Sequence, residues 1–257
     1  MKKVLTIAGS DPSGGAGIQA DLKTMSAYKV YGMSAITALT AQNTTGVYGI
    51  FEADANFVGL QIECVFEDIP PDAVKIGMVS NVEIIEIIAA KLKQYGAKNI
   101  VLDPVMVATS GSKLLNDDAM QAITSKLFAQ ADIITPNILE AEVLCDIKVK
   151  GADDMMAAAK KLSAMTHGAV MIKGGHLPDS ADDLLYFRDK AIWIEGKRID
   201  NPNTHGTGCT LSSAIACGLA LGHDMQTSVR NAKEYITGAL KASLNLGKGS
   251  GPLNHLY

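Results

Sequence analysis

Short apolar runs alternate with longer amphipathic runs along most of the chain. Residues 4–8 form the first apolar run, and residues 18–28 follow it with the spacing of a helix. Further strands are predicted at residues 34–39, 73–76, 99–102, 132–135 and 169–172, and further helices at residues 82–95, 117–128 and 153–165. This alternation is typical of βαβ units, whose helical crossovers place consecutive strands in parallel. Because the strands are almost entirely apolar, we expect helices on both faces of the sheet.

Two segments interrupt this alternation. Residues 43–52 and 184–199 contain strand-like runs that read as hairpins, the second turning near residues 188–190, and we expect edge strands or a cover there. Residues 206–221 and 224–246 show helical patterns that are rich in small side chains. No internal repeat, linker or low-complexity tract divides the sequence. The predicted fold is one α/β domain over residues 1–257, with a doubly wound, mostly parallel sheet, helices on both faces and a small β cover.

The composition fits one globular domain and excludes several classes of protein. Of the 257 residues, 47% are hydrophobic and 19% are charged, which supplies a large core and argues against disorder. The net charge of −4 and the absence of a Lys/Arg cluster argue against a nucleic-acid partner. No apolar run approaches the ~18 residues of a membrane span. The four cysteines and five histidines show no metal-ligand spacing, so we expect a cytoplasmic protein without a structural zinc.

The first glycine-rich segment, Gly-Ser-Asp-Pro-Ser-Gly-Gly-Ala-Gly at residues 9–17, lies between the first strand and the first helix. Glycines permit positive φ angles and close approach of the main chain to a ligand. Residues 15–20 also satisfy the G-x-G-x-x-A pattern of dinucleotide-binding proteins. That pattern requires an acidic residue about 20 positions later, and residues 22–51 contain none. The sequence therefore argues against an oxidoreductase, while a purely structural glycine turn stays open.

A second glycine-rich turn, Thr-His-Gly-Thr-Gly-Cys-Thr at residues 204–210, precedes a late helix. Gly206, Thr207 and Gly208 allow main-chain N–H groups to converge, and the helix adds its positive end, so this turn is predicted to bind an anion. No G-x-x-x-x-G-K-[ST] motif occurs. Cys209 stands at the helix start, where a depressed pKa would make its thiol a proton acceptor or nucleophile. The alternative is a small buried cysteine with a packing role only.

Polar side chains follow three further predicted strands. Asp103 comes after the strand at 99–102, Asn137 and Glu140 follow the strand at 132–135, and Lys173 follows the strand at 169–172. Because ligands bind beyond the carboxyl ends of parallel strands, we expect these side chains at one edge of the sheet. Carboxylate oxygens suit Mg²⁺ and its water shell, and a lysine suits phosphate. Together with the anion-binding turn they favour phosphoryl transfer. Taken singly, Asn137 and Glu140 are equally an ordinary helix cap.

These segments resemble the hydroxymethylpyrimidine/phosphomethylpyrimidine kinases of the ribokinase-like superfamily. The matching motifs lie at residues 8–23, 41–44, 75–78, 103–106, 135–137, 173–176 (Lys-Gly-Gly-His) and 205–209, and so cover essentially the whole chain. The resemblance implies ATP- and Mg²⁺-dependent phosphorylation of 4-amino-5-hydroxymethyl-2-methylpyrimidine, and then of its monophosphate, in thiamine biosynthesis. It also implies a homodimer.

The resemblance assigns roles to particular residues. Gln42, Asp21, Gly9 and Met78 would bind the pyrimidine; Gly206, Thr207, Gly208 and Cys209 would hold the transferring phosphoryl group; Asn137, Lys173 and Lys233 would contact ATP; Asp103 and Glu140 would hold Mg²⁺. The carboxamide of Gln42 offers a donor and an acceptor to an aminopyrimidine edge. Many related kinases carry Asp where Cys209 stands, and we expect Cys209→Ala to lose most turnover while retaining nucleotide binding. Without the resemblance, Asp21 and Lys233 would be read as solvated and Met78 as core.

Three other functions remain to be weighed. A pyridoxal kinase of the same family shares the glycine-rich motifs, but pyridoxal lacks the amino group that Gln42 suits. A catalytically silent nucleotide sensor is disfavoured because Asp103, Glu140, Lys173 and Cys209 occur together. A cysteine hydrolase is disfavoured because no base partner for Cys209 can be found from spacing.

Overall fold

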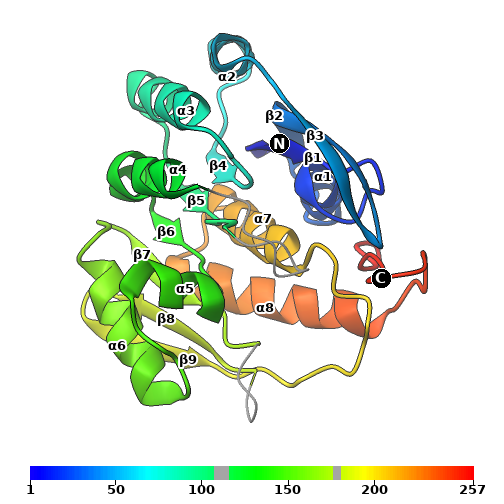
Figure 1. The fold of residues 1–257 in the computed structure, drawn as a ribbon, viewed down its shortest axis with the longest axis vertical. Coiled ribbons are helices and arrows are strands. Elements are labelled where there is room, and N and C mark those ends of the chain that lie inside the picture. Colours follow the sequence, from blue (N-terminus) through cyan, green and yellow to red (C-terminus); the bar gives the residue numbers. More distant parts are fainter. Residues whose placement is uncertain (107–115, 176–180) are drawn as a thin grey trace.

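Nine strands form a single sheet in the computed structural model, which describes residues 1–106, 116–175 and 181–257 (Figure 1). The strands are β1 (Lys3–Ser10), β2 (Tyr31–Asn43), β3 (Gly46–Glu52), β4 (Ala73–Ile76), β5 (Ile100–Leu102), β6 (Ile133–Ile134), β7 (Ala169–Ile172), β8 (Asp183–Phe187) and β9 (Lys190–Ile194). Their order across the sheet is β3-β2-β1-β4-β5-β6-β7-β8-β9. His176, the last residue of one sequence motif, lies outside the described residues.

Six neighbouring strands are parallel and form the centre of this sheet. β1 pairs with β2 on one side and with β4 on the other, and β4 to β7 continue in parallel. β3 and β8 run antiparallel to their neighbours, and β9 pairs antiparallel with β8. The turn between β8 and β9 contains Arg188 and Asp189 at φ 51° and 59°, as expected for a two-residue hairpin loop. The predicted mostly parallel sheet with hairpins at its edges is confirmed.

Helices cover both faces of the sheet, as the apolar strands predicted (Figure 1). They are α1 (Gly17–Ala27), α2 (Ala55–Asp68), α3 (Val82–Gln94), α4 (Asp117–Ala122), α5 (Ile138–Cys145), α6 (Ala152–Ser163), α7 (Thr207–Ala220) and α8 (Met225–Lys241). One core lies between the sheet and α2 to α6, and a second lies between the sheet and α1, α7 and α8. The β strands contribute alternate side chains to the two cores.

Helix α7 is almost completely enclosed by the second core. Every residue from Thr210 to Ala220 is buried, because the helix lies between the sheet, α1 and α8. Its small side chains allow this close packing: a Cβ atom on Gly218 would lie 2.8 Å from Ser228 Oγ on α8. The small residues noted in the sequence thus position the amino end of α7 firmly against the sheet.

Some predicted elements differ from those observed. α2 has no counterpart in the prediction, and the predicted helix at 117–128 is α-helical only to Ala122 before it continues as a π turn and a 3₁₀ turn. The last helix ends at Lys241 rather than at 246. In the part of the chain that the structure describes, no helix combines the length and apolar character that crossing a membrane requires.

Residues 250–257 pack against the turn that opens α7. The main-chain N–H of His205 donates to Gly251 O at 3.2 Å. The His255 ring Nε2 lies 2.9 Å from Thr210 Oγ1 on α7, and Tyr235 Oη donates to His255 O at 2.8 Å. Burial lowers the pKa of His255 to about 4, so this ring is neutral near pH 7. The segment therefore fixes the first turn of α7 from outside.

Candidate active site

The two glycine-rich segments meet at the carboxyl edge of the sheet. Gly206 has φ 84°, and a Cβ atom on it would overlap the main-chain carbonyl of Gly15. Gly17 has φ 56°, and a Cβ atom on it would overlap the carbonyl of Gly9. Neither close approach is open to a residue with a side chain. The loop after β1 and the turn before α7 therefore form one continuous main-chain surface.

The turn at residues 206–209 forms the amino end of α7, with Gly206 as its N-cap. The first N–H groups of a helix have no intrahelical acceptor, and the helix dipole adds positive potential for an anion. The Thr207 N–H donates to Thr204 O at 3.3 Å, so the N–H groups of Gly208 and Cys209 are the ones left for an anion. A Cβ atom on Gly208 would lie 3.2 Å from Asp103 Oδ2 and 3.4 Å from Lys173 Nζ. The space above Gly208 is thus bounded by a carboxylate and an ammonium group and would be filled by any side chain.

Lys173 links the two carboxylates that follow β5 and β6. Its Nζ lies 2.7 Å from Asp103 Oδ1 and 4.0 Å from Glu140 Oε2. Burial opposes the charge of Lys173, but the two carboxylates outweigh it and raise its pKa. Burial raises the pKa of Glu140 to about 7, with Asp103 adding to the effect and Lys173 opposing it. The cluster therefore holds one permanent cation beside a carboxyl that titrates near neutrality.

Asn137 and Glu140 form a capping box at the start of α5. The side chain of Asn137 accepts from Glu140 N at 2.9 Å, and Glu140 Oε2 accepts from Asn137 N at 2.7 Å. The helix-cap interpretation of these residues is therefore correct in geometry. Because the cap also brings Glu140 within 4.0 Å of Lys173, the same turn places a carboxyl at the edge of the candidate anion site.

The fit of Mg²⁺ can be judged from the donors present. Across residues 1–106, 116–175 and 181–257, no three His, Cys, Asp or Glu side chains gather as a ligand set. Asp103 and Glu140 are two carboxylates beside an anion-binding turn, and Mg²⁺ in proteins is commonly held by one or two carboxylates, water and substrate phosphates. The site fits a magnesium ion carried with the nucleotide phosphates rather than one held by protein ligands only.

Cys209 lies in the first turn of α7, but its thiol does not have the predicted depressed pKa. Burial raises the pKa of Cys209 to about 11, and Asp21 and Asp103 raise it further, while Lys75 and an N–H from Gly17 oppose them. The expectation of a thiolate at this helix end is therefore wrong, because desolvation outweighs the helix dipole. At neutral pH this thiol is protonated and is a poor base.

Below the turn lies a buried ion pair that was not predicted from the sequence. Lys75 Nζ lies 2.9 Å from both carboxylate oxygens of Asp21, and neither side chain has any exposed surface. Thr6 Oγ1 and Ser213 Oγ donate to the same carboxylate at 2.6 and 2.7 Å. Burial opposes the charge of Lys75, but Asp21 outweighs it, with Cys209 and Asp103 adding to the rise in its pKa. Asp21 is thus neither solvated nor an open carboxylate.

The other residues expected at the acceptor ring lie near one another. Met78 lies directly against Gly9, since a Cβ atom on Gly9 would come within 2.6 Å of Met78 Cε. Gln42 stands near the end of β2, with Oε1 3.1 Å from Thr40 Oγ1 and Nε2 3.3 Å from His205 Nε2. His205 itself precedes the turn at residues 206–209. The structure therefore brings the ring-binding and phosphate-binding candidates to one edge of the sheet.

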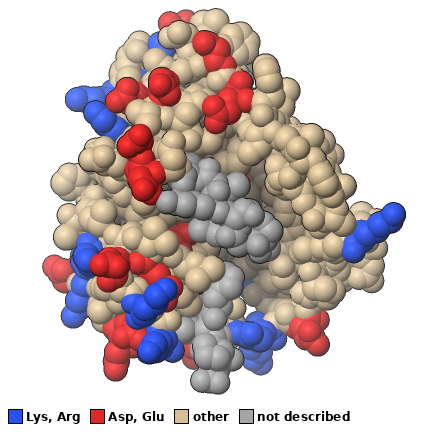
Figure 2. Space-filling model, in the orientation of Figure 1, with Lys and Arg blue, Asp and Glu red and all other residues tan. Residues whose placement is uncertain are grey.

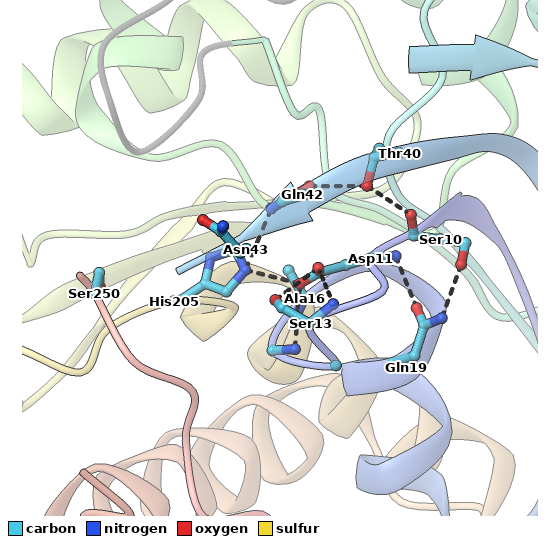
Figure 3. A network of polar contacts seen from close by, with 12 residues as sticks. Ser10, Asp11, Ser13, Ala16, Gln19, Thr40, Gln42, Asn43, His205 and Ser250 are labelled. Atoms are coloured by element: carbon cyan, nitrogen blue, oxygen red, sulfur yellow. Dashed lines mark hydrogen bonds and ion pairs between the residues drawn. The ribbon is translucent and has the colours of Figure 1, made fainter. Parts of the chain in front are cut away.

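Asp11 anchors the contact between these segments (Figure 3). His205 Nε2 lies 2.8 Å from Asp11 Oδ2, and the same carboxylate accepts from Ser13 N and Ala16 N, both at 2.9 Å. Burial works against ionisation of Asp11, but the hydrogen bonds from His205, Ser13 and Ala16 outweigh it and lower its pKa. Asp11 is therefore a carboxylate that holds the glycine loop and the α7 turn together.

Lys233 lies on α8, the last helix in the described part of the chain. Its Nζ donates to Asp183 Oδ2 at 2.6 Å and to Ala181 O at 2.9 Å. Asp183 Oδ1 in turn accepts from Gly174 N at 2.8 Å. Lys233 is therefore connected to the segment after β7 through Asp183, and it is largely buried rather than solvated.

Comparison with known proteins identifies the family of the chain. The sequence profile of the family described as phosphomethylpyrimidine kinase matches residues 11–254. The hydroxymethylpyrimidine/phosphomethylpyrimidine kinase of Streptomyces coelicolor is 46% identical over 98% of this chain and 93% of its own length. Since the profile spans most of the chain and the identity is high, the family predicted from the sequence is confirmed.

Solved structures give the same result for the fold. The phosphomethylpyrimidine kinase of Clostridium difficile is 48% identical with a TM-score of 0.84, over 93% of this chain and 99% of that one. The ADP complex of a Bacillus subtilis pyridoxal kinase is 41% identical with a TM-score of 0.91, over 99% of this chain and 97% of that one. The ribokinase-like fold is therefore confirmed, and a nucleotide is seen bound in a structure that shares it. The chain belongs to the hydroxymethylpyrimidine/phosphomethylpyrimidine kinase family of phosphotransferases.

Proposed function

We propose that the chain transfers the γ-phosphoryl group of ATP to 4-amino-5-hydroxymethyl-2-methylpyrimidine and then phosphorylates the resulting monophosphate. The observation that carries this proposal is the space above Gly208, where the open N–H groups of α7, the ammonium of Lys173 and the carboxylate of Asp103 converge. Phosphoryl transfer depends mainly on positioning and on neutralising charge, and this arrangement supplies both.

The proposed roles follow from where each group lies. Gly206, Thr207 and Gly208 hold the transferring phosphoryl group through their main chain. Lys173 neutralises phosphate charge, with Asn137 and Lys233 at the nucleotide. Magnesium, bound through water and phosphate near Asp103 and Glu140, would screen the charge between donor and acceptor.

On the acceptor side, Gln42 reads the ring edge and Gly9 and Met78 form the wall beside it. Asp21 supports the acceptor site from beneath the first turn of α7, because its carboxylate is already held by Lys75. Cys209 lies next to the acceptor hydroxyl as a neutral thiol and orients it. The hydroxyl proton passes to an oxygen of the transferred phosphoryl group, because a loose transition state requires no strong base at the acceptor.

Pyridoxal kinase activity is the second candidate, favoured by one observation. The Bacillus subtilis pyridoxal kinase has a TM-score of 0.91 to this chain. Release of ADP measured with the pyrimidine alcohol, its monophosphate and pyridoxal separates the two functions. We expect both pyrimidines to be preferred, and a strong preference for pyridoxal would overturn the proposal.

We further propose a homodimer formed through β3. This strand is at one end of the sheet, so its outer edge has no partner strand among the described residues. It carries exposed Val47, Tyr48, Ile50 and Phe51, with exposed Leu39 on β2 and Phe57 and Leu60 on α2 nearby. Figure 2 shows few charged side chains over the region of β3, at the upper right of the view. A twofold axis would pair two such faces. Light scattering should give a dimer, and Phe51→Lys should give a folded monomer.

A cytoplasmic location is proposed on chemical grounds. The four cysteines are all free, as expected in a reducing compartment, and the proposed reaction draws on ATP. Fractionation of cells that express the native chain tests this location.

A further inference from the structure

A chain of polar contacts runs from the glycine loop to β2 through His205 (Figure 3). His205 Nε2 lies 2.8 Å from Asp11 Oδ2 and 3.3 Å from Gln42 Nε2. The other end of the Gln42 amide lies 3.1 Å from Thr40 Oγ1, and Thr40 Oγ1 lies 2.9 Å from Ser10 O. Each contact is short enough for a hydrogen bond, so the position of every proton along this series of contacts matters.

The two acceptors at the ends of this series of contacts, Asp11 and Ser10, decide where two of these protons lie. The Asp11 carboxylate can only accept, so His205 Nε2 must carry a proton, in the neutral ring or in the charged one. The main-chain oxygen of Ser10 can also only accept, so the hydroxyl proton of Thr40 points toward it. Thr40 then has only lone pairs to offer to Gln42.

These two protons leave one favourable orientation for the Gln42 amide. With its nitrogen toward His205, an N–H would face an N–H and its oxygen would face an oxygen without a proton. With the two ends exchanged, Gln42 Oε1 faces the single N–H of His205 Nε2, which it shares with the closer Asp11 Oδ2, and Gln42 Nε2 donates to Thr40 Oγ1. The oxygen and nitrogen of an amide occupy almost the same space, so the contacts of 3.3 and 3.1 Å suit this orientation equally.

We propose that His205 is a positioning residue that orients the Gln42 amide and thereby selects the acceptor ring. The inference rests on the proposed function, in which Gln42 contacts that ring. In the assigned orientation the amide keeps one free N–H on the Thr40 side and one free lone pair on the His205 side. An aminopyrimidine satisfies both when its amino group lies toward His205 and its ring nitrogen toward Thr40. A ring without an amino group at that edge leaves the lone pair unmatched.

The geometry can be tested before any substrate is added. Long-range ¹H–¹⁵N spectra of the wild-type protein report which ring nitrogen of each histidine carries a proton, and His205→Leu identifies the His205 signals. We expect a protonated Nε2 near pH 7.5. An unprotonated Nε2 would overturn the assigned orientation and the proposal with it.

The consequence for selectivity is tested by kinetics with the pyrimidine alcohol and with pyridoxal. His205→Leu and Thr40→Val should each raise KM for the pyrimidine by about tenfold, the usual effect of leaving a polar group unpaired, and change kcat far less. The preference for the pyrimidine over pyridoxal should fall by a similar factor. Thr40→Ser keeps the hydroxyl and should restore the wild-type preference.

Gln42→Ala separates failure of this inference from failure of the proposed function. If Gln42→Ala loses the preference and both His205→Leu and Thr40→Val keep it, the positioning role is wrong while the ring contact stands. If Gln42→Ala itself keeps the preference and KM, Gln42 does not read the ring, and the proposed acceptor site is wrong as well.

Discussion

Lys75 and Asp21 form an ion pair that is completely shielded from solvent, with Nζ 2.9 Å from both carboxylate oxygens. It lies beneath the first turn of α7, and Ser213 from that helix donates to the same carboxylate at 2.7 Å. The pair therefore joins β4, α1 and α7 at the floor of the candidate active site. Its two charges also act on the Cys209 thiol, whose pKa Asp21 raises and Lys75 lowers.

Removing one member of this pair should destabilise the fold. Lys75→Met leaves the Asp21 carboxylate buried without its counter-ion, and we expect a loss of about 3 kcal/mol or more in the free energy of unfolding. The measurement is unfolding in urea. The double variant Lys75→Met, Asp21→Asn removes both charges and should recover part of the loss. Equal stability of the single and double variants would show that charge burial is not the cause.

Glu140 should make stability depend on pH in a defined direction. Its folded pKa of about 7 lies above the ordinary value of 4.5, so the folded state binds the proton more tightly than the unfolded state. This contribution is complete below pH 4.5 and is lost as the pH rises through 7. Glu140→Gln keeps the capping contact but cannot titrate. The wild type should therefore lose stability relative to Glu140→Gln between pH 4.5 and 7, measured by urea unfolding across that range. If the free energies of unfolding of the two proteins changed in parallel with pH, the raised pKa of Glu140 would be contradicted.

Two glycines of the anion-binding turn should respond differently to alanine. Gly208 lies within α7, so Gly208→Ala is compatible with the helix, but its Cβ would stand 3.2 Å from Asp103 Oδ2. We expect a folded protein with at least tenfold lower kcat/KM for ATP. Gly206 has φ 84° and touches Gly15, so Gly206→Ala should lower Tm markedly. Normal turnover in Gly208→Ala would argue against phosphate binding at this turn.

The Cys209 thiol should react slowly with alkylating agents. With a pKa of about 11, only a small fraction is thiolate at pH 7.5, and the rate of alkylation by iodoacetamide should rise about tenfold per pH unit between pH 7 and 9. A Cys64→Ser background removes the exposed cysteine, and Cys209→Ser identifies the modified site by mass. A rate that is already independent of pH at 7.5 would restore the thiolate interpretation.

Much of the site could be predicted because strand ends impose its location. Asp103, Asn137 and Lys173 each follow a parallel strand, so they had to lie at the same edge of the sheet. The glycine-rich turns were equally visible, because close main-chain approach demands glycine at defined positions. The family and its reaction class followed from the same motifs and are confirmed.

What could not be predicted depends on burial, which local sequence does not report. The thiol of Cys209 follows the helix-end rule in sequence, but desolvation reverses it in the folded chain. Lys75 stands in a strand of otherwise apolar residues, and its position there was the available signal that a buried carboxylate must face it. α2 was missed because it exposes Phe57 and Leu60 and so lacks a clear apolar stripe.

The packing of residues 250–257 on the turn at His205 has a consequence for biosynthesis. A ribosome makes the glycine loop first and this segment more than 230 residues later, yet Gly251 and His255 are needed to fix the opening turn of α7. A nascent chain that already carries every residue of the proposed nucleotide site would therefore lack an ordered turn at residues 206–209 until this segment leaves the exit tunnel. Catalytic competence should appear late and abruptly during translation.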